Sequence, residues 1–316
     1  MRKGLVYANF AAMNERFYFD RAILDRAAHL RQEPDQQHPD LAEAREIILP
    51  VWRDRSLVWL NDPSAVKLER AEAAWFKENA SVLMFLGLED GVAYYGAELS
   101  HLEAAEDVPL PEGASFEDLR RLASTVESRE AGYLAYARAL GYWNRTYQYC
   151  GACGSPTLSQ RSGHERKCSN EDCARSHFPR TDPAVIMLVT HPSEDKCLLG
   201  HNKRFQGLRY STIAGFVEPG ESLEHAVARE VYEETGIRTV DQVYQASQPW
   251  PFPASIMLGF RAVGVNVDVD LIDNELLDAR WFSREEVHEM AAEGNILPPP
   301  GYSISRWLID TWLSEK

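Results

Sequence analysis

The chain has 316 residues, of which 45% are hydrophobic and 26% are charged, so it is long enough for two or three domains with substantial cores. Its formal net charge of −15 argues against a broad nucleic-acid-binding surface, although one nucleotide or one RNA end could still occupy a pocket. No apolar run reaches the roughly 18 residues that a membrane-spanning helix needs. The first residues, MRKGLVYANF, lack a long apolar core and a small-residue cleavage site, so we expect a cytoplasmic protein without a signal peptide.

Residues 1–145 predict a mixed α/β domain. After an aromatic-rich start that includes Tyr7 and Phe10, a helix is predicted over 20–31, and the polar, proline-bounded segment 33–40 predicts a surface loop.

Further elements of this domain follow from turn and capping signals. Strand-like segments lie at 47–49 and 57–60, and 82–99 predicts a β-hairpin whose turn contains an Asp-Gly pair. A helix is predicted from Ser115, through Leu140, to an end at Gly141. The sequence of this domain contains no acid–base cluster and no phosphate-binding loop. We therefore expect it to support the rest of the chain, with room for substrate or dimer contacts.

Four of the five cysteines cluster in residues 146–179. Two residues separate Cys150 from Cys153, four separate Cys168 from Cys173, and fourteen lie between the two pairs. Paired thiolates on two tight turns can close a tetrahedral zinc site without an open position for chemistry, and the gap fits a short hairpin, as in a zinc ribbon. We expect a structural Zn²⁺ that stabilises a segment too small to have its own core.

Other uses of these residues remain open. The cysteines could form a disulfide or stay unliganded, although nothing indicates secretion. His164 and His177 lie nearby in the sequence and could replace a cysteine, but with four cysteines available we expect both to be bystanders. Cys197 stands alone in a strand-like segment, where a cysteine usually behaves as a small buried hydrophobe.

The last part of the chain, 180–316, predicts buried strands around a central helix. Helical patterns are also present near the end. The predicted strands are 184–190, 197–199, 210–214, 243–246, 255–263 and one that contains Trp281, and the late helices are 285–293 and 303–315.

The central helix belongs to the segment 215–237, which reads GFVEPGESLEHAVAREVYEETGI. Ser222 is a suitable N-cap, because its hydroxyl can accept a hydrogen bond from an amide of the first turn. Gly236 occupies the position of a left-handed C-cap.

The glutamates of this helix decide its interpretation. At about 100° per residue, Glu230, Glu233 and Glu234 share a face with Ala226 and Val227. Carboxylates at this spacing repel each other, the C-terminal end of a helix disfavours negative charge, and burial without a partner is costly. A bound divalent cation would offset the repulsion and the cost of burial, and carboxylate oxygens suit Mg²⁺ or Mn²⁺. The alternative is an ordinary surface helix with incidental acids.

The complete spacing is more specific than its parts. It runs Gly, five residues, Glu, seven residues, Arg-Glu, two residues, Glu-Glu, one residue, Gly and an aliphatic residue, from Gly215 to Ile237. This matches the Nudix box in full, and the sequence resembles the Nudix hydrolase family. The resemblance implies an α/β/α sandwich and hydrolysis of a nucleoside diphosphate linked to another group. We expect Arg229 and Glu221 to brace the loop and the helix by pairing.

The segment 247–255, SQPWPFPAS, follows the box. Its prolines stiffen the backbone, and Trp250 and Phe252 present flat faces suited to stacking on a base. A rigid surface loop that packs its own aromatic rings is the alternative. The segment is similar to a signature of NADH pyrophosphatases, a Nudix subfamily that also has a four-cysteine zinc segment and an N-terminal domain. This resemblance is firm over about 146–305 and weaker before it.

Carried over residue by residue, the resemblance implies a metal site and a substrate site. Glu230, Glu233 and Glu234 would bind the catalytic ions, with Glu234 the candidate to activate water. Glu275 would join them, as would the backbone carbonyl of Ala214. The implied substrate-binding residues are Phe178, Phe216, Gln248, Pro249, Trp250, Pro251, Phe252, Pro253, Ala254, Ser255 and Ser305.

Two of these assignments carry a departure from the family pattern. Phe216 would stack on the nicotinamide side, and Phe178 would reach in from the other subunit of a homodimer. Family members commonly have tyrosine at the position of Phe178, so the stacking face is kept but a hydroxyl is lost. Ser305 matches a substrate-contact position only across a one-residue gap.

The resemblance implies hydrolysis of NADH or NAD⁺ to AMP and nicotinamide mononucleotide, and removal of NAD caps from RNA 5′ ends. Two alternatives stay open: a Nudix hydrolase for ADP-ribose or another dinucleotide, and a zinc-ribbon interaction protein with an inactive Nudix domain. The predicted domains are an N-terminal α/β domain at 1–145, a zinc ribbon at 146–179 and a Nudix domain at 180–316.

Overall fold

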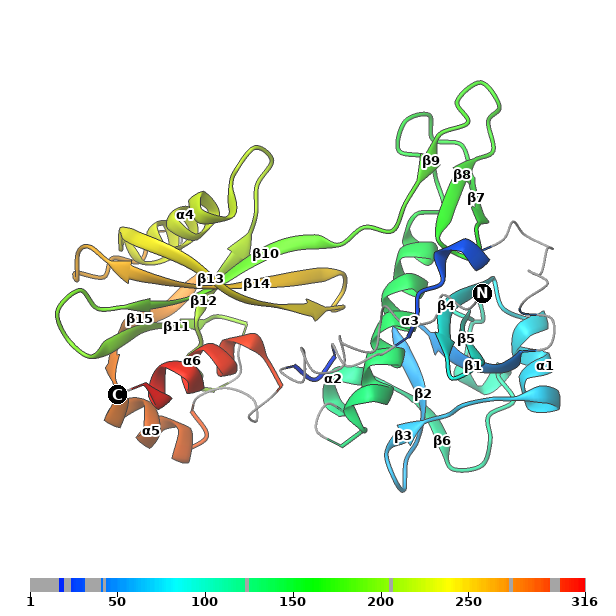
Figure 1. Cartoon of the computed structure of the whole chain (residues 1–316), viewed down its shortest axis with the longest axis horizontal. Helices are drawn as coiled ribbons and strands as arrows, with labels where there is room; N and C mark the ends of the chain where they lie inside the picture. Colours follow the sequence, from blue (N-terminus) through cyan, green and yellow to red (C-terminus); the bar gives the residue numbers. More distant parts are fainter. Residues whose placement is uncertain are drawn as a thin grey trace, which may run out of the picture. The chain divides into compact units, whose positions relative to one another are not determined.

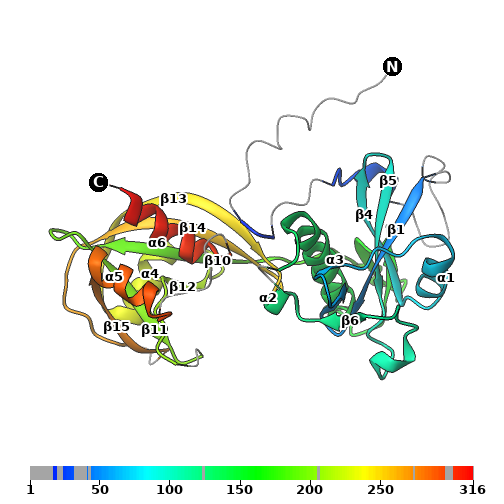
Figure 2. The same ribbon diagram turned by 90° about the horizontal axis from the view of Figure 1, so that it is seen from below.

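The chain divides into two compact units in a computed structural model (Figures 1 and 2). Unit 1 consists of Met1–Thr181 and Pro251–Ala254, and unit 2 consists of Asp182–Trp250 and Ser255–Lys316. The structure describes residues 17–19, 24–31, 41, 44–122, 125–204, 207–272, 275–295 and 302–315. Tyr7, Phe10, the predicted loop 33–40 and the start of the predicted helix 20–31 lie outside these ranges.

Unit 1 is built on a mixed β-sheet. The strand order is β3-β2-β1-β5-β4, with β6 also paired to β2; β1 runs parallel to β5, and the other neighbours are antiparallel. Its elements are η1 (Ala28–Leu30), β1 (Arg45–Trp52), β2 (Arg55–Trp59), β3 (Ser64–Ala65), α1 (Arg70–Glu78), β4 (Val82–Glu89), β5 (Val92–Glu98), η3 (Ala105–Asp107), β6 (Ala114–Glu117), α2 (Leu119–Leu122) and α3 (Ser128–Thr146).

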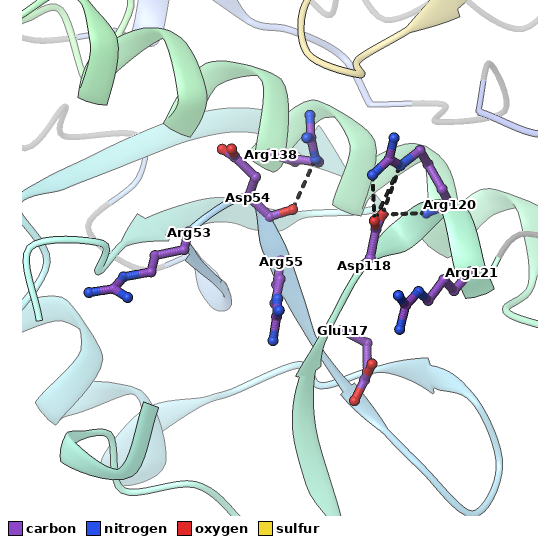
Figure 3. A pocket seen from close by; sticks show the side chains of 8 residues that line it. All are labelled: Arg53, Asp54, Arg55, Glu117, Asp118, Arg120, Arg121 and Arg138. Atoms are coloured by element: carbon purple, nitrogen blue, oxygen red, sulfur yellow. Dashed lines mark hydrogen bonds and ion pairs between the residues drawn. The ribbon is translucent and has the colours of Figure 1, made fainter. Parts of the chain in front are cut away.

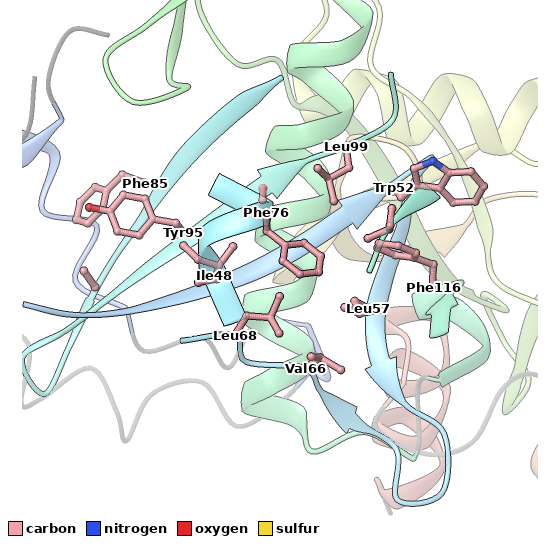
Figure 4. Close-up of a cluster of buried hydrophobic side chains, with 14 of the residues drawn as sticks. Ile48, Trp52, Leu57, Val66, Leu68, Phe76, Phe85, Tyr95, Leu99 and Phe116 are labelled. Carbon is pink, nitrogen blue, oxygen red and sulfur yellow. The ribbon is translucent and has the colours of Figure 1, made fainter. Parts of the chain in front are cut away.

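The core of unit 1 lies between α1 and its sheet. Ile48, Leu57, Phe76 and Phe116 bring together β1, β2, α1 and β6 in one buried cluster (Figure 4). Full burial of each large apolar side chain stabilises the fold by about 1.5–3 kcal/mol. Helix α3 covers the other face of the sheet (Figure 2). The result is a sandwich of helix, sheet and helix.

Helix α3 corrects the prediction of one helix from Ser115 to Gly141. Ser115 lies in strand β6, opposite Val58. The helix begins after Glu127, whose side chain accepts hydrogen bonds from the amides of the first turn, and it continues past Gly141 to Thr146. Gly141 is buried inside this helix, and it does not adopt the left-handed conformation that would end it.

The N-terminal helix prediction is also wrong over its described part. Residues 24–31 contain only the short 3₁₀ turn η1. Asp25 instead exchanges backbone hydrogen bonds with Leu88 at the edge of β4. Because an extended residue completes the sheet edge there, tertiary pairing overrides the helical pattern of the sequence.

The cysteine segment forms a small antiparallel sheet that belongs to unit 1. Its strands are β7 (Thr157–Gln160), β8 (Glu165–Cys168) and β9 (Ser176–His177), in the order β7-β8-β9. Asn144 of α3 donates to the carbonyl of Gly163 at 2.9 Å, and His164 Nε2 lies 2.7 Å from the carbonyl of Phe85. The turn between β7 and β8 is thereby fixed to α3 and β4.

Unit 2 contains a second mixed sheet, in the order β13-β14-β10-β11-β15, with β12 paired to β10. Helix α4 covers one face and α6 the other (Figure 1). The elements are β10 (Asp182–Thr190), β11 (Lys196–Asn202), β12 (Ile213–Phe216), α4 (Leu223–Thr235), β13 (Thr239–Trp250), β14 (Ser255–Gly264), β15 (Leu276–Ser283), α5 (Arg284–Ala292) and α6 (Ile304–Ser314).

The two units repeat one topology. In unit 1, β1 pairs antiparallel with β2 and parallel with β5 of the β4-β5 hairpin, and β2 pairs with β6. In unit 2, β10 pairs antiparallel with β11 and parallel with β14 of the β13-β14 hairpin, and β11 pairs with β15. Helix α1 therefore corresponds in chain order to α4. Helix α1 lacks the acid pattern of α4, because its sequence is RAEAAWFKE. None of the described helices combines the length and hydropathy that a lipid bilayer requires of a spanning helix.

Candidate catalytic and zinc sites

Helix α4 has the two ends that the sequence predicts. The Ser222 hydroxyl accepts a hydrogen bond from the His225 amide at 3.2 Å, and Gly236 adopts a left-handed conformation with φ of 69°. Ala226, Val227 and Val231 are fully buried against the sheet. These caps and contacts fix the rotation of the helix, and therefore the directions of its glutamates.

The three glutamates differ in exposure. Glu234 is buried and Glu230 is largely buried, as predicted. The Glu233 side chain is 48% exposed, so the prediction that it shares the apolar face is wrong. Glu233 lies about 100° around the helix from Glu234, and this rotation takes it to the solvent-facing margin. From this position the flexible side chain of Glu233 can extend toward a ligand bound at the edge of the helix.

Gly215 makes room for the carboxylate of Glu230. A Cβ at this position would lie 1.9 Å from Glu230 Cδ and about as close to both carboxylate oxygens. Gly215 lies in β12 beside Ala214, and both residues pair with β10. The close approach of β12 to α4 therefore brings the backbone around Ala214 near the acids.

Arg229 binds the loop to the helix. Its Nε and Nη2 donate to the two Glu221 carboxylate oxygens at 2.6 and 3.0 Å, and Nη2 also donates to the Phe216 carbonyl at 2.8 Å. This arginine lowers the pKa of Glu221 to about 2. The predicted bracing role of Arg229 and Glu221 is confirmed. Nη1 of Arg229 also lies 2.9 Å from Glu230 and 2.8 Å from Glu233.

The surroundings of Glu230 favour a cation. Burial raises the pKa of Glu230, the ion pair with Arg229 opposes this, and repulsion from Glu233 and Glu275 raises it further. Glu275, which immediately precedes β15, therefore lies within electrostatic reach of Glu230. Glu230, Glu233 and Glu275 interact electrostatically, but in the described residues only the four cysteines lie close enough together to form a ligand group. Carboxylate oxygens of this kind suit hard divalent ions such as Mg²⁺ or Mn²⁺.

The segment 247–255 is a hairpin rather than one loop. Its first part ends strand β13, where Gln248 lies opposite Met257 and Trp250 opposite Ser255. Pro249 is tolerated there because β13 is an edge strand, where a missing amide donor removes no pairing with a further strand. Only the tip, Pro251–Ala254, leaves the sheet, and it groups with unit 1.

Two residues expected to bind substrate are engaged inside unit 2. Gln248 is 1% exposed; its Oε1 accepts from the Ile304 amide at 2.8 Å, and its Nε2 donates to the Tyr302 carbonyl at 2.9 Å. The Ser305 hydroxyl lies 2.8 Å from that of Thr212. Both side chains thus hold the N-terminal end of α6 in place.

The aromatic residues of the predicted substrate site have different surroundings. Phe178 is 62% exposed and Phe216 is 58% exposed, so both rings are accessible. Trp250 packs edge-on against Tyr302. Phe252, within unit 1, packs against Phe19, and the guanidinium of Arg138 lies 4.8 Å from its ring centre.

The four predicted zinc ligands are brought together. The Sγ atoms of Cys150, Cys153, Cys168 and Cys173 all lie within 4.8 Å of one another, which suits tetrahedral coordination. Hydrogen bonds from Ser155 lower the pKa of Cys153 to about 6, which favours the thiolate that a metal requires.

Neither nearby histidine nor the fifth cysteine is part of the group of four sulfurs. His164 is a bystander as predicted, because its ring bonds to Phe85. His177 Nε2 lies 3.3 Å from Cys150 Sγ, next to the four sulfurs but outside the group they form. Cys197 is fully buried in β11, as predicted for a small apolar residue.

One cluster was not predicted from the sequence. Unit 1 brings five arginines together around a cavity, and Arg138 of this set also contacts the hairpin tip. The Arg-Asp-Arg run at 53–55 and the Arg120-Arg121 pair, within an acidic chain, were the available signals.

Comparisons with known proteins find two families along the chain. The NUDIX domain family matches residues 180–299, and the NADH pyrophosphatase-like rudimentary NUDIX domain family matches 45–143. The NAD-capped RNA hydrolase NudC of Stutzerimonas stutzeri is 38% identical over 231 residues, which cover 72% of this chain and 78% of that protein.

Two longer relatives match a smaller share of their own length. Human NAD-capped RNA hydrolase NUDT12 is 41% identical over 197 residues, covering 60% of this chain and 43% of the relative. Nudix hydrolase 19, chloroplastic, of Arabidopsis thaliana is 42% identical over 231 residues, covering 68% of this chain and 52% of the relative. The matched part thus spans about half the length of these two relatives.

Proposed function

Because the chain belongs to the Nudix hydrolase family, we propose that it hydrolyses the pyrophosphate bond of NADH and NAD⁺, giving AMP and nicotinamide mononucleotide. The observation that carries this proposal is Glu230 of α4, which packs against Gly215 and shares the Arg229 guanidinium with Glu233. The relatives named as NAD-capped RNA hydrolases support a second substrate, the NAD cap at an RNA 5′ end. With a net charge of −15, contacts with such an RNA would be limited to its first nucleotides.

The catalytic metal would be Mg²⁺ or Mn²⁺, held by Glu230, Glu233, Glu234 and Glu275 with the carbonyl of Ala214. When bound, such ions neutralise phosphate charge and lower the pKa of a coordinated water. Glu234 is the candidate base, because it is buried on the helix face beside these acids and can take the proton of the attacking water. Arg229 keeps the loop that begins at Phe216 against the helix.

The substrate would bind along β13 and β14, with Pro249, Trp250 and Ser255 among its contacts. Phe216 offers an exposed ring for stacking on the nicotinamide. We further propose a homodimer in which the exposed ring of Phe178 reaches the partner's site. Gln248 and Ser305 would act indirectly, by positioning the start of α6.

The four-cysteine site would hold a structural Zn²⁺ that stabilises the small sheet β7-β8-β9. Its geometry supports this, because four sulfurs converge without room for a substrate ligand. Four cysteines kept as thiolates require a reducing compartment, which supports a cytoplasmic location.

A substrate comparison tests the proposal. The purified chain is given NADH, NAD⁺, ADP-ribose and NAD-capped RNA at equal concentration, with Mg²⁺ or Mn²⁺, and the products are separated by chromatography. We expect AMP from NADH, and RNA with a 5′-monophosphate from the capped RNA. Faster turnover of ADP-ribose than of any NAD-containing substrate would favour the other dinucleotide hydrolase. Absence of hydrolysis of all four would favour a binding protein.

A further inference from the structure

Unit 1 contains a cavity of about 290 Å³ whose described lining residues are all charged (Figure 3). The cavity lies where the turn between β1 and β2, the end of β6, α2 and α3 meet. Five arginines face three carboxylates in it, although the whole chain carries a net charge of −15. The lining residues are Arg53, Asp54, Arg55, Glu117, Asp118, Arg120, Arg121 and Arg138.

Two of the three carboxylates are already neutralised. Asp118 pairs with Arg120 at 2.7 Å, and Asp54 pairs at 2.7 Å with Arg145, which is not part of the lining. Glu117 accepts a hydrogen bond from the Ser115 hydroxyl at 3.0 Å. Glu117 is therefore the carboxylate that is left to balance the other arginines.

Arg55 and Arg121 supply the unused positive charge. Among the described residues, neither guanidinium has a hydrogen-bond or ion-pair partner. Arg55 extends from β2 and Arg121 from α2, on the two sides of Glu117 in Figure 3. Two guanidinium groups with free donors can bind one phosphate through several charge-assisted hydrogen bonds.

Arg138 adds a buried guanidinium to the cavity. It is 6% exposed, and it donates to the carbonyls of Asp54 and Pro251 rather than to a carboxylate. Burial lowers the pKa of Arg138, Asp54 and Asp118 oppose this shift, and repulsion from Arg120 and Arg145 adds to it. An anion bound in the cavity would offset the desolvation and repulsion that these carboxylates leave.

We propose that this cavity binds the dianionic phosphate of a phosphomonoester. Its volume is at the lower end for small-molecule pockets, which suits a single end group and not a length of RNA backbone. The described lining has no aromatic or apolar residue to hold a base or sugar, so the phosphate is recognised irrespective of the group attached to it. This inference goes beyond the proposed hydrolysis and uses none of its residues.

The test measures binding to the full chain by isothermal titration calorimetry, without added Mg²⁺ or Mn²⁺. The probes are inorganic phosphate, ribose 5-phosphate and adenosine. We expect both phosphates to bind and adenosine not to bind. The double variant Arg55→Ala/Arg121→Ala should bind ribose 5-phosphate at least tenfold more weakly. The matched variant Lys167→Ala/Arg238→Ala removes two exposed charges elsewhere and should bind as the wild type does.

Further variants distinguish binding in the cavity from binding elsewhere on the chain. Glu234→Gln should bind ribose 5-phosphate unchanged, because the catalytic acids lie in unit 2. Arg55→Lys/Arg121→Lys keeps both positive charges but removes the planar guanidinium groups, whose paired N–H donors fit a phosphate. This variant should bind ribose 5-phosphate with intermediate affinity and keep the wild-type melting temperature. This conservative pair tests the proposal even if the alanine pair does not fold.

A short RNA distinguishes the two sources of the phosphate. An oligonucleotide with a 5′-phosphate should compete with ribose 5-phosphate, and the same RNA with a 5′-hydroxyl should not. Equal competition by the two RNAs would mean that backbone phosphates are bound, and would overturn the proposal. Undiminished binding of ribose 5-phosphate by a folded Arg55→Ala/Arg121→Ala variant would overturn it as well.

Discussion

Gly215 and Glu230 approach so closely that a Cβ on the glycine would lie 1.9 Å from the carboxyl carbon of the glutamate. In Gly215→Ala the flexible Glu230 side chain must move, while the backbone of β12 can stay in place. We expect hydrolysis of NADH to fall about 100-fold, because a displacement of this size misplaces a catalytic group. Gly151→Ala adds a methyl in open space and should leave the rate unchanged. Steady-state kinetics and circular dichroism measure the effect and the fold.

Glu234→Gln keeps the size of the buried side chain but removes its charge and its ability to accept a proton. We expect kcat to fall by about 10²–10⁴, the usual contribution of a general base, with little change in the melting temperature. Glu224→Gln, on the exposed first turn of the same helix, is the control and should retain full activity. If Glu234→Gln hydrolyses NADH as fast as the wild type does, another group activates the water.

Gln248→Met removes both hydrogen bonds to the start of α6 at nearly constant volume. The Ile304 amide and the Tyr302 carbonyl then lose their partners, which costs about 1–3 kcal/mol of unfolding free energy. Urea unfolding measures this loss, and Gln245→Met, on the same strand, should cost less than half as much. A raised KM with unchanged stability would show that Gln248 contacts the substrate instead.

His164 makes unit 1 sensitive to acid. Burial lowers its pKa to about 4, although the bond to the Phe85 carbonyl opposes this shift. The unfolded chain, with a histidine pKa near 6.5, binds the proton first. The contribution of neutral His164 to the unfolding free energy is therefore fully present above about pH 6.5. It is lost as the pH falls through 4, and this loss amounts to about 3 kcal/mol. In His164→Gln the unfolding free energy should fall less between pH 7 and 4, whereas the exposed His288→Gln should behave as the wild type.

Cys153→Ser removes one sulfur from the four-cysteine group. We expect zinc, measured by elemental analysis, to drop to background, and protease cleavage to increase within β7-β8-β9, since that sheet has too small a core to fold without metal. Cys197→Ala removes a thiol that lies outside the group and should retain zinc. Full zinc content in Cys153→Ser would contradict this ligand set.

The parts of the fold that the sequence predicts correctly depend on local signals. Ser222 and Gly236 mark the ends of α4, and the Asp90-Gly91 turn marks the hairpin of β4 and β5. Each of these features is decided within a few residues. The cysteine spacing is equally local, and it predicts a group of four sulfurs that the structure confirms.

The failures are at positions where distant residues decide the outcome. Gly141 looks like a helix end, but it lies buried inside α3, which continues to Thr146. The bonds of the buried Gln248 amide to Tyr302 and Ile304, more than fifty residues further on, could not be predicted from its own segment, and its contact with substrate stays a prediction. The arginine cavity joins residues from 53 to 138, and no single stretch of sequence contains it.

The hairpin tip Pro251–Ala254 belongs to unit 1, although the strands on both sides of it belong to unit 2. Neither unit is therefore a continuous piece of the polypeptide, and a gene fragment that stops at residue 181 encodes an incomplete body. In such a truncation the buried Arg138 guanidinium would lose its hydrogen bond to the carbonyl of Pro251. During synthesis the first unit therefore stays incomplete until Pro251–Ala254, which follow strand β13, have been added to the chain.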